Sequence, residues 1–253
     1  MTTVPPTSAV IAEVTALGPF FSLSTHATGV PPVEPWVAMS RPLIEARVTA
    51  VRQWLASAGH QSPDAVEVRV AASVTHLGLA ARLLSPALAA LVLHDRVLAF
   101  DLADVHWQPV LGGPVPLSLP ATAVRAASPA AEGLGALLDG PLAELSDAMR
   151  PFSLSSPILR GNLASALNGA ATMIAAARPD LAARSRAAVG LALAGPALCG
   201  SARSTANGGF QRGSCCLIYR AAPDRKGALC GDCVLHRPAR GPRGGGWIRA
   251  SGD

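Results

Sequence analysis

The sequence predicts an α+β fold that is mostly helical, with one small antiparallel sheet and a cysteine-bearing C-terminal segment. Three observations favour this class. Apolar residues make up 50% of the 253 residues and charged residues only 15%, which is typical of a globular chain with a sizeable core. Apolar side chains recur at helical spacing over several long stretches. One short region instead has the alternation and the glycine turn of paired strands.

The first fifty-eight residues predict two helices. A short amphipathic helix is expected at about 8–17, and an irregular proline-rich segment follows it up to residue 40. Apolar residues three and four positions apart then predict a helix from Arg41 to Ala58, which ends at Gly59.

A long helical segment is predicted at about 65–93, with Ser62-Pro63-Asp64 as its cap. Pro86 lies inside this segment. Proline lacks the backbone N–H and clashes with the preceding turn, so we expect it to kink or split the helix.

Residues 97–120 carry the strand signals. Three short β-type runs surround Gly112-Gly113 and predict the small antiparallel sheet. From about 130 to 199 the pattern is helical again, broken by prolines and a glycine. The expected helical pieces are 131–149, 156–177 and 180–198.

The N-terminus lacks the basic and apolar regions of a secretory signal, and no run of eighteen apolar residues is free of breakers. We therefore expect a cytoplasmic protein with no integral membrane segment. In a reducing compartment, clustered cysteines favour metal or redox chemistry over structural disulfides.

The formal net charge of +5 belongs to the C-terminal end. Residues 1–200 carry 12 Lys/Arg against 13 Asp/Glu, whereas residues 201–253 carry 9 against 3. Such an end suits nucleic acid, a membrane surface, an acidic partner or simply a solvated tail. Gly and Pro interrupt the basic residues and aromatic side chains are few, so we expect no nucleic-acid partner.

Four cysteines, Cys215, Cys216, Cys230 and Cys233, lie within nineteen residues. Thiolate sulfur is a soft donor that favours zinc or iron–sulfur clusters. Neighbouring side chains on a strand diverge, so the adjacent pair needs a local bend to reach one ion, whereas a two-iron cluster offers the pair two metal targets. The spacing therefore leans toward a [2Fe–2S] cluster, with a structural zinc site and a thiol–disulfide redox pair as open alternatives.

The flanks of these cysteines resemble a known family. Phe210 to Arg220 and Cys230 to Leu235 are similar to the C-terminal end of the FhuF-type ferric-siderophore reductases. The resemblance extends upstream through Arg69, Ser73, His76, Arg82-Leu83, Pro86 and residues 161–166.

The resemblance implies that Cys215, Cys216, Cys230 and Cys233 bind one [2Fe–2S] cluster. It also implies that this cluster passes single electrons to a bound ferric siderophore, which we expect to be of the hydroxamate type, and that iron is released as Fe²⁺. Hard oxygen donors hold Fe³⁺ far more tightly than Fe²⁺, so one-electron reduction loosens the complex. The alternative is a non-enzymatic, zinc-stapled helical protein whose basic C-terminus docks an acidic partner or nucleic acid.

This interpretation divides the chain into three parts. Residues 1–200 form a mainly helical substrate or scaffold region with its sheet near 97–120. Residues 201–236 form the iron–sulfur binding segment, and residues 237–253 form a basic flexible tail.

Four further residues near the cysteines are candidates for a role in metal binding or electron transfer. Cys199 is expected to be a small buried apolar side chain. His236 could replace a ligand or donate to a sulfur, although a partly exposed position is the simpler expectation. Arg212 and Arg220 flank the cysteine pair and could offset the charge of a cluster or attract an acidic ferredoxin-like electron donor, although solvation explains them equally well.

Upstream, His76 and Arg82 lie six residues apart and so do not share a helical face, which argues against a joint role. His106 and Trp107 could line a substrate pocket, but Trp107 is better explained as core filling.

Overall fold

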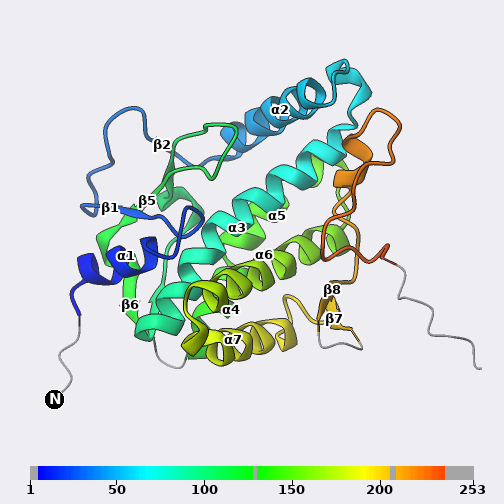
Figure 1. The fold of residues 1–253 in the computed structure, drawn as a ribbon. Helices are drawn as coiled ribbons and strands as arrows, with labels where there is room; N and C mark the ends of the chain where they lie inside the picture. Colours follow the sequence, from blue (N-terminus) through cyan, green and yellow to red (C-terminus); the bar gives the residue numbers. More distant parts are fainter. Residues whose placement is uncertain (1–4, 128–129, 206–208, 237–253) are drawn as a thin grey trace, which may run out of the picture.

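The structure, a computed structural model, describes residues 5–127, 130–205 and 209–236 (Figure 1). It confirms the predicted class, because the chain is mostly helical with small sheets. The basic tail predicted for residues 237–253 lies outside the described residues.

Helix α3 (Val68–His94) forms the centre of the molecule (Figure 1). It packs most extensively against α6 (Ser156–Ala177) and also against α2 (Arg41–Ala58) and α1 (Thr7–Thr15). The bounds of α2 and α6 are those that the apolar spacing predicts, and Gly59 ends α2 as expected.

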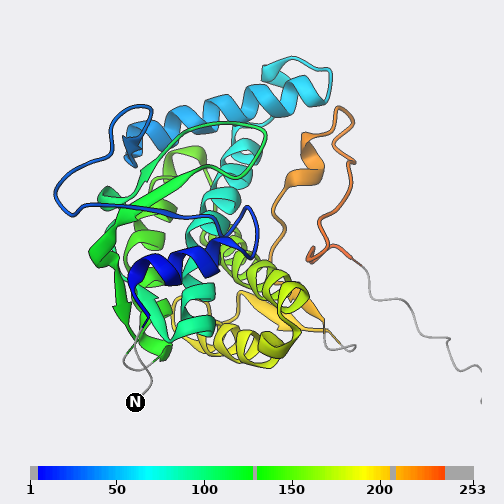
Figure 2. The same ribbon diagram turned by 60° about the vertical axis from the view of Figure 1, so that its left-hand side comes forward.

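The remaining helices cover α3 on the side of α6 (Figure 2). They are α4 (Ala130–Asp139), α5 (Pro141–Asp147) and α7 (Ala182–Ala194). The single helix predicted at 131–149 is therefore two helices, divided at Gly140. Pro141 occupies the first position of α5, where its missing N–H costs nothing.

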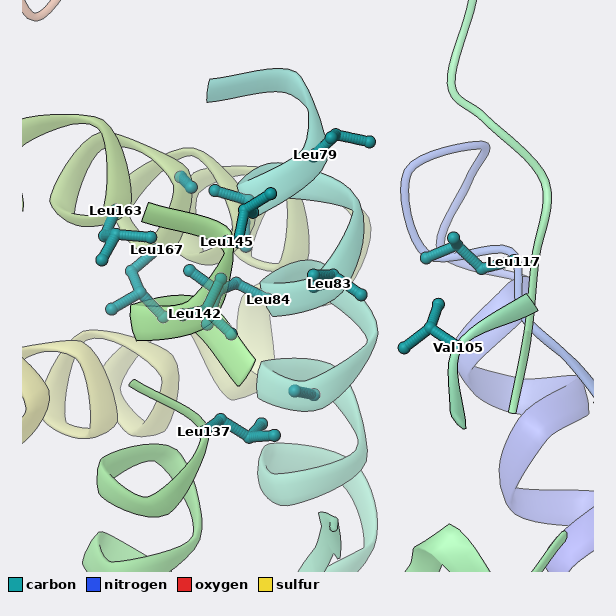
Figure 3. Packing of buried hydrophobic residues seen from close by; sticks show 14 of the residues in the cluster. Leu79, Leu83, Leu84, Val105, Leu117, Leu137, Leu142, Leu145, Leu163 and Leu167 are labelled. Atoms are coloured by element: carbon teal, nitrogen blue, oxygen red, sulfur yellow. The ribbon is translucent and has the colours of Figure 1, made fainter. Parts of the chain in front are cut away.

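Pro86 does not split α3, so of the two predicted outcomes, a kink or a split, the split is wrong. Proline inside a helix costs about 3 kcal/mol or more, because the carbonyl four residues earlier loses its donor. Burial outweighs this cost, since both faces of α3 lie in the core. In Figure 3, Leu84 points toward Leu142 and Leu167, while Leu83 points the other way, toward Leu117.

By length and composition alone, α3 could cross a membrane, with a mean hydropathy of 1.6 over its most apolar window. However, 78% of that window is buried inside the protein. Packing against its neighbours therefore accounts for the apolar composition of α3.

The main sheet has four strands, and residues 97–120 supply only two of them. Its order is β1 (Ser24–His26), β5 (Leu117–Pro120), β4 (His106–Trp107) and β2 (Val37–Ala38). The pair β4–β5 is antiparallel as predicted. β2, which was not predicted, is antiparallel to β4, and β1 runs parallel to β5. The proline-rich segment that was expected to be irregular therefore completes this sheet on both edges.

The first predicted strand run joins a different sheet. β3 (Arg96–Leu98) pairs with β6 (Val124–Ala126) and not with β4. A left-handed residue, Asp95, turns the chain directly from α3 into β3, which fixes β3 beside the end of the helix.

Arg82 connects α3 to the sheet layer. Its guanidinium donates to the carbonyl oxygens of Val115 (2.7 Å), Ser22 (2.6 Å) and Phe20. The side chain is buried, and this burial lowers the pKa of Arg82 to about 10. Arg82 is thus structural. It shares no hydrogen-bond partner with His76, in agreement with the spacing, which argues against a joint role.

Candidate metal centre

A β-hairpin presents the cysteine segment to the helices. It consists of β7 (Ala202–Ser204) and β8 (Phe210–Arg212). The backbone N–H of Arg212 donates to the carbonyl of Asp232 at 3.0 Å. The neighbouring Gln211 donates from Nε2 to the carbonyl of Cys233 at 3.1 Å. β8 therefore holds the second pair of cysteines directly.

The adjacent cysteines Cys215 and Cys216 do not lie on a strand. Leu217 follows them with a φ of 69°, in the left-handed region that a non-glycine residue rarely adopts. The chain therefore bends directly after the cysteine pair. The N–H of Leu217 donates to Cys215 Sγ at 3.3 Å, after which the chain enters the 3₁₀ turn Ile218–Ala221.

The second pair lies in a tight turn, in which the N–H of Cys233 donates to the carbonyl of Cys230 at 3.0 Å. The N–H of Leu235 lies 3.5 Å from Cys233 Sγ. The amides that contact sulfur thus belong to Leu217 and Leu235, each two residues after a cysteine. Such contacts stabilise negative charge on the sulfurs.

The four sulfurs are arranged as two close pairs. Cys216 Sγ lies 3.5 Å from Cys230 Sγ, and Cys215 Sγ lies 3.7 Å from Cys233 Sγ. Each pair joins the adjacent-cysteine arm to the Cys-x-x-Cys arm. Cys216 and Cys233 are buried, whereas Cys215 and Cys230 are half-buried. Each close pair therefore contains one buried and one partly accessible sulfur.

These distances can be compared with tetrahedral metal coordination. Metal–sulfur bonds of about 2.3 Å place two thiolates on one tetrahedral ion about 3.8 Å apart. The sulfur–sulfur distances in both close pairs are near this value. Among the described residues, no three His, Cys, Asp or Glu side chains are grouped to hold a single ion. The donor set is therefore two plus two, which fits two metal ions with two cysteines each.

The protein environment disfavours bare thiolates at this centre. Burial, followed by the neighbouring thiols, raises the pKa of Cys215 to about 11 and that of Cys230 to about 12. At neutral pH these groups stay protonated unless nearby positive charge compensates them. Metal ions are the usual source of such charge at a cysteine cluster.

The thirteen-residue loop between Cys216 and Cys230 is anchored to the start of α3 (Figure 1). Arg220 forms an ion pair with Glu67 at 2.6 Å, and Gln61 Nε2 donates to the carbonyl of Ala221 at 2.6 Å. Partial burial acts to raise the pKa of Glu67, but hydrogen bonds from Arg220 and Arg69 lower it overall. Arg220 is therefore not simply solvated, which was one of the expectations for it, but forms an ion pair with Glu67.

A buried polar network joins the hairpin to the helix core. Arg212 Nη2 donates to Asn162 Oδ1 of α6 at 2.6 Å. Asn162 Nδ2 in turn contacts the carbonyl of Ser73 at 3.1 Å and His76 Nδ1 at 3.4 Å, both on α3. The upstream positions that resemble the family, Ser73, His76 and Asn162, therefore meet behind the cysteines.

Gly161 makes this contact with α6 feasible. A Cβ at this position would lie 2.4 Å from Ser214 Oγ and 3.0 Å from Arg212 Nη2. Ser214 Oγ also donates to the carbonyl of Pro157 at 2.7 Å. The missing side chain of Gly161 therefore admits the residues that precede the cysteine pair.

The network fixes His76 as a neutral side chain. Asn162 Nδ2 is a donor, so His76 Nδ1 accepts and its proton resides on Nε2, 3.0 Å from Ser146 Oγ. Burial, assisted by the charge of Arg212, lowers the pKa of His76 to about 3.

Acidification should therefore destabilise the protein through His76. Its pKa lies below the value of about 6.5 expected when unfolded, so the unfolded state binds the extra proton as the pH falls from about 6.5 to 3. Stability should be complete above this window and fall by up to about 1.4 kcal/mol per pH unit within it. Urea unfolding at pH 7, 6 and 5 should show a shallower loss for His76→Gln. Equal slopes in both proteins would remove His76 from the acid response.

Three further expectations near the cysteines have clear outcomes. Cys199 is exposed, so its expected burial is wrong. It lies after α7 has ended, in a turn outside the core. His236 is also exposed, as expected, and its Nε2 lies 2.8 Å from the carbonyl of Cys230. Arg212, for which solvation was an equal expectation, is buried.

His106 and Trp107 lie on β4, in the sheet layer. Trp107 is fully buried, which confirms its core role. His106 packs edge-on against His26 with ring centroids 4.9 Å apart. Neither residue lines the cavity beside the cysteines.

This cavity has a volume of about 280 Å³ and opens beside Cys230. Its walls come mainly from α3 and α6. They include Phe20, Leu77, Ala81, Ala166, Gly169, Met173, Arg212 and Cys230. A small apolar hollow thus adjoins a partly accessible sulfur.

Comparison with known proteins addresses the same segment. No curated protein matches the chain. Residues 212–235 match the family model described as the FhuF 2Fe-2S C-terminal domain. The match begins at Arg212, includes all four clustered cysteines and is short relative to the chain. It confirms that the cysteine segment is similar to the C-terminal domain of the FhuF-type siderophore reductases.

Proposed function

We propose that the protein is a one-electron reductase of ferric siderophores that holds a [2Fe–2S] cluster on Cys215, Cys216, Cys230 and Cys233. The two-plus-two arrangement of the sulfurs, inside the segment that matches the FhuF 2Fe-2S model, carries this proposal. On this arrangement, Cys216 and Cys230 would hold one iron, and Cys215 and Cys233 would hold the other. When bound, such a cluster supplies a reversible one-electron carrier.

The zinc-stapled alternative receives less support. A single zinc needs four thiolates around one point, whereas the described residues contain no group of three such side chains. The basic tail that this alternative uses for docking lies outside the described residues. The geometry thus favours two metal ions over one.

The chain's own residues determine where an electron leaves the centre. Cys216 and Cys233 face the protein interior, and the partly accessible Cys215 and Cys230 face outward. A substrate held against Cys215 or Cys230 would therefore lie next to the centre. The reaction requires proximity and a suitable potential, with no nucleophile or acid–base pair.

We place the substrate at the cavity beside Cys230. Its apolar walls suit the aliphatic arm of a hydroxamate chelate, with the bulk of the complex outside, since 280 Å³ is small. We also propose an acidic ferredoxin-like donor and a cytoplasmic location. Exposed basic residues of the loop, such as Arg225, support the donor, and the five free cysteines suit a reducing compartment.

The decisive experiment is an analysis of anaerobically purified protein. We expect a reddish protein with visible absorption, and about two irons and two acid-labile sulfides per chain. With a chemical reductant and a trishydroxamate iron complex, a Fe²⁺ trap should develop signal. A colourless protein with one zinc would overturn the cluster, while a complete cluster without Fe²⁺ release would overturn the substrate alone.

Filling the cavity should weaken substrate binding. Gly169→Leu adds a side chain from α6 where a Cβ meets nothing within 4 Å. We expect KM for the trishydroxamate complex to rise roughly tenfold, as for loss of a modest apolar contact, with an unchanged visible spectrum. Gly190→Leu, which adds leucine beside another cavity along α7, is the matched control. Equal KM values for the two variants would remove the substrate from this cavity.

A further inference from the structure

Arg212 is fully buried behind the cysteines. Its Nε donates to the carbonyl of Ser214 at 2.5 Å, and its Nη2 contacts Asn162 Oδ1 at 2.6 Å and the carbonyl of Ile158 at 3.3 Å. Its Nη1 is also buried and has no hydrogen-bond partner among the described residues. Two of the three guanidinium nitrogens thus fix the side chain, and the third is unused.

Every partner of this guanidinium is neutral. Among the described residues, no carboxylate forms an ion pair with Arg212. An arginine cannot lose its proton in a protein, and an uncompensated buried charge costs several kcal/mol. The protein therefore maintains a positive charge here that its own side chains do not balance.

Two other arginines differ from Arg212 in how their guanidinium nitrogens are used. Arg82 is buried too, but its three guanidinium nitrogens each donate to a carbonyl oxygen. Arg220 is paired with Glu67. Arg212 is thus distinct because it is buried with one guanidinium nitrogen, Nη1, unused.

Arg212 lies beside the cysteine segment and beside Asp232, which lines the same cavity. Arg212 precedes Cys215 by three residues, and its backbone N–H is bonded to Asp232, between Cys230 and Cys233. Arg212 and Cys230 line the same cavity. A negative charge on this sulfur cluster therefore lies within the field of Arg212.

We propose that Arg212 is the fixed counter-cation of the iron–sulfur centre and raises its reduction potential. A [2Fe–2S] cluster on four thiolates is anionic, and it gains one further negative charge when it accepts an electron. A fixed positive charge in a low-dielectric surrounding stabilises the reduced form more than the oxidised form. Asn162 and Gly161 are positioning residues, since one holds the guanidinium and the other leaves room for it. The inference rests on the proposed cluster but is independent of the substrate.

The test is an anaerobic potentiometric titration of the loaded protein, followed by visible absorption and electron paramagnetic resonance. Arg212→Gln should shift the midpoint potential to more negative values, and Arg212→Lys should retain most of the wild-type potential. Arg220→Gln is the matched control: it removes the same formal charge from the other flank, where Glu67 already balances it. A wild-type midpoint in Arg212→Gln, or an equal shift in Arg220→Gln, would overturn the proposal.

A second variant keeps the arginine in place, in case Arg212→Gln does not load the cluster. Asn162→Asp puts a carboxylate oxygen where Asn162 Oδ1 lies, 2.6 Å from Arg212 Nη2, and so balances the charge within the protein. At pH 8, where His76 is neutral, we expect a more negative midpoint than in the wild type. An unchanged midpoint would contradict the counter-cation role. Because no siderophore enters either titration, these results are separate from the test of substrate reduction.

Discussion

Cys230→Ser should remove the visible absorption of the cluster and lower the rate of Fe²⁺ release by more than about 100-fold. This exceeds the loss expected when the changed residue contacts a metal ligand but does not itself bind the metal. Cys230 supplies one sulfur of the 3.5 Å pair with Cys216. A serine oxygen is a harder donor that stays protonated far above neutral pH, so it replaces a thiolate poorly. Iron and sulfide analysis together with the trap assay provides the measurement.

Cys199→Ser is the matched control, because Cys199 is exposed and lies outside the cluster of sulfurs. It should leave both the spectrum and the rate unchanged. Mild oxidation of the apoprotein tests the pairing directly: peptide mapping should recover the disulfides 216–230 and 215–233. Recovery of 230–233 as the main product would contradict the two-plus-two arrangement.

Gly161→Ala should lower cluster content and destabilise the protein, although alanine is the better helix former. In an exposed helix, replacing glycine by alanine stabilises by about 1 kcal/mol. At Gly161 the new Cβ would meet Ser214 Oγ at 2.4 Å and Arg212 Nη2 at 3.0 Å. Forced contacts of this kind cost about 1–3 kcal/mol, so we expect a net loss of stability and a displaced cysteine segment.

The same exchange in α3 should have the opposite sign. Gly78 is exposed, and its Cβ would meet nothing within 4 Å. Gly78→Ala should therefore raise the free energy of unfolding and leave the cluster intact. Urea unfolding and iron content measured on both variants decide the matter, and a stabilised, fully loaded Gly161→Ala would show that α6 and the hairpin do not need this close approach.

The helices were predictable where a local pattern determines them. Apolar spacing with flanking turn residues is sufficient for α2 and α6, whose bounds match the prediction. The split allowed for at Pro86 does not occur because a local penalty of about 3 kcal/mol competes with the burial of α3 in the core, which a local pattern does not reveal. The parallel partner β1 was missed for the same reason, since its pairing with β5 joins residues more than ninety positions apart.

The candidate site divides in the same way. Soft-donor chemistry and spacing identify the four cysteines, and the resemblance extends to Ser73, His76 and Asn162. The link through Arg212 was not predictable, because a residue three positions before a cysteine can face solvent or core equally well. Glu67 was also missed, since only the folded chain brings it to Arg220 across 153 positions.

The cysteine segment has almost no interior of its own. Apart from one 3₁₀ turn and a short hairpin, it consists of loop, and its orientation depends on Asn162 and Glu67 of the helical body. We therefore expect that this segment does not keep its structure when it is moved to another protein. Residues 201–236 fused to a foreign carrier would bring the sulfurs but leave behind the surfaces that hold them in pairs. New versions of this centre are accordingly better sought by redesigning the loop in place than by grafting the motif elsewhere.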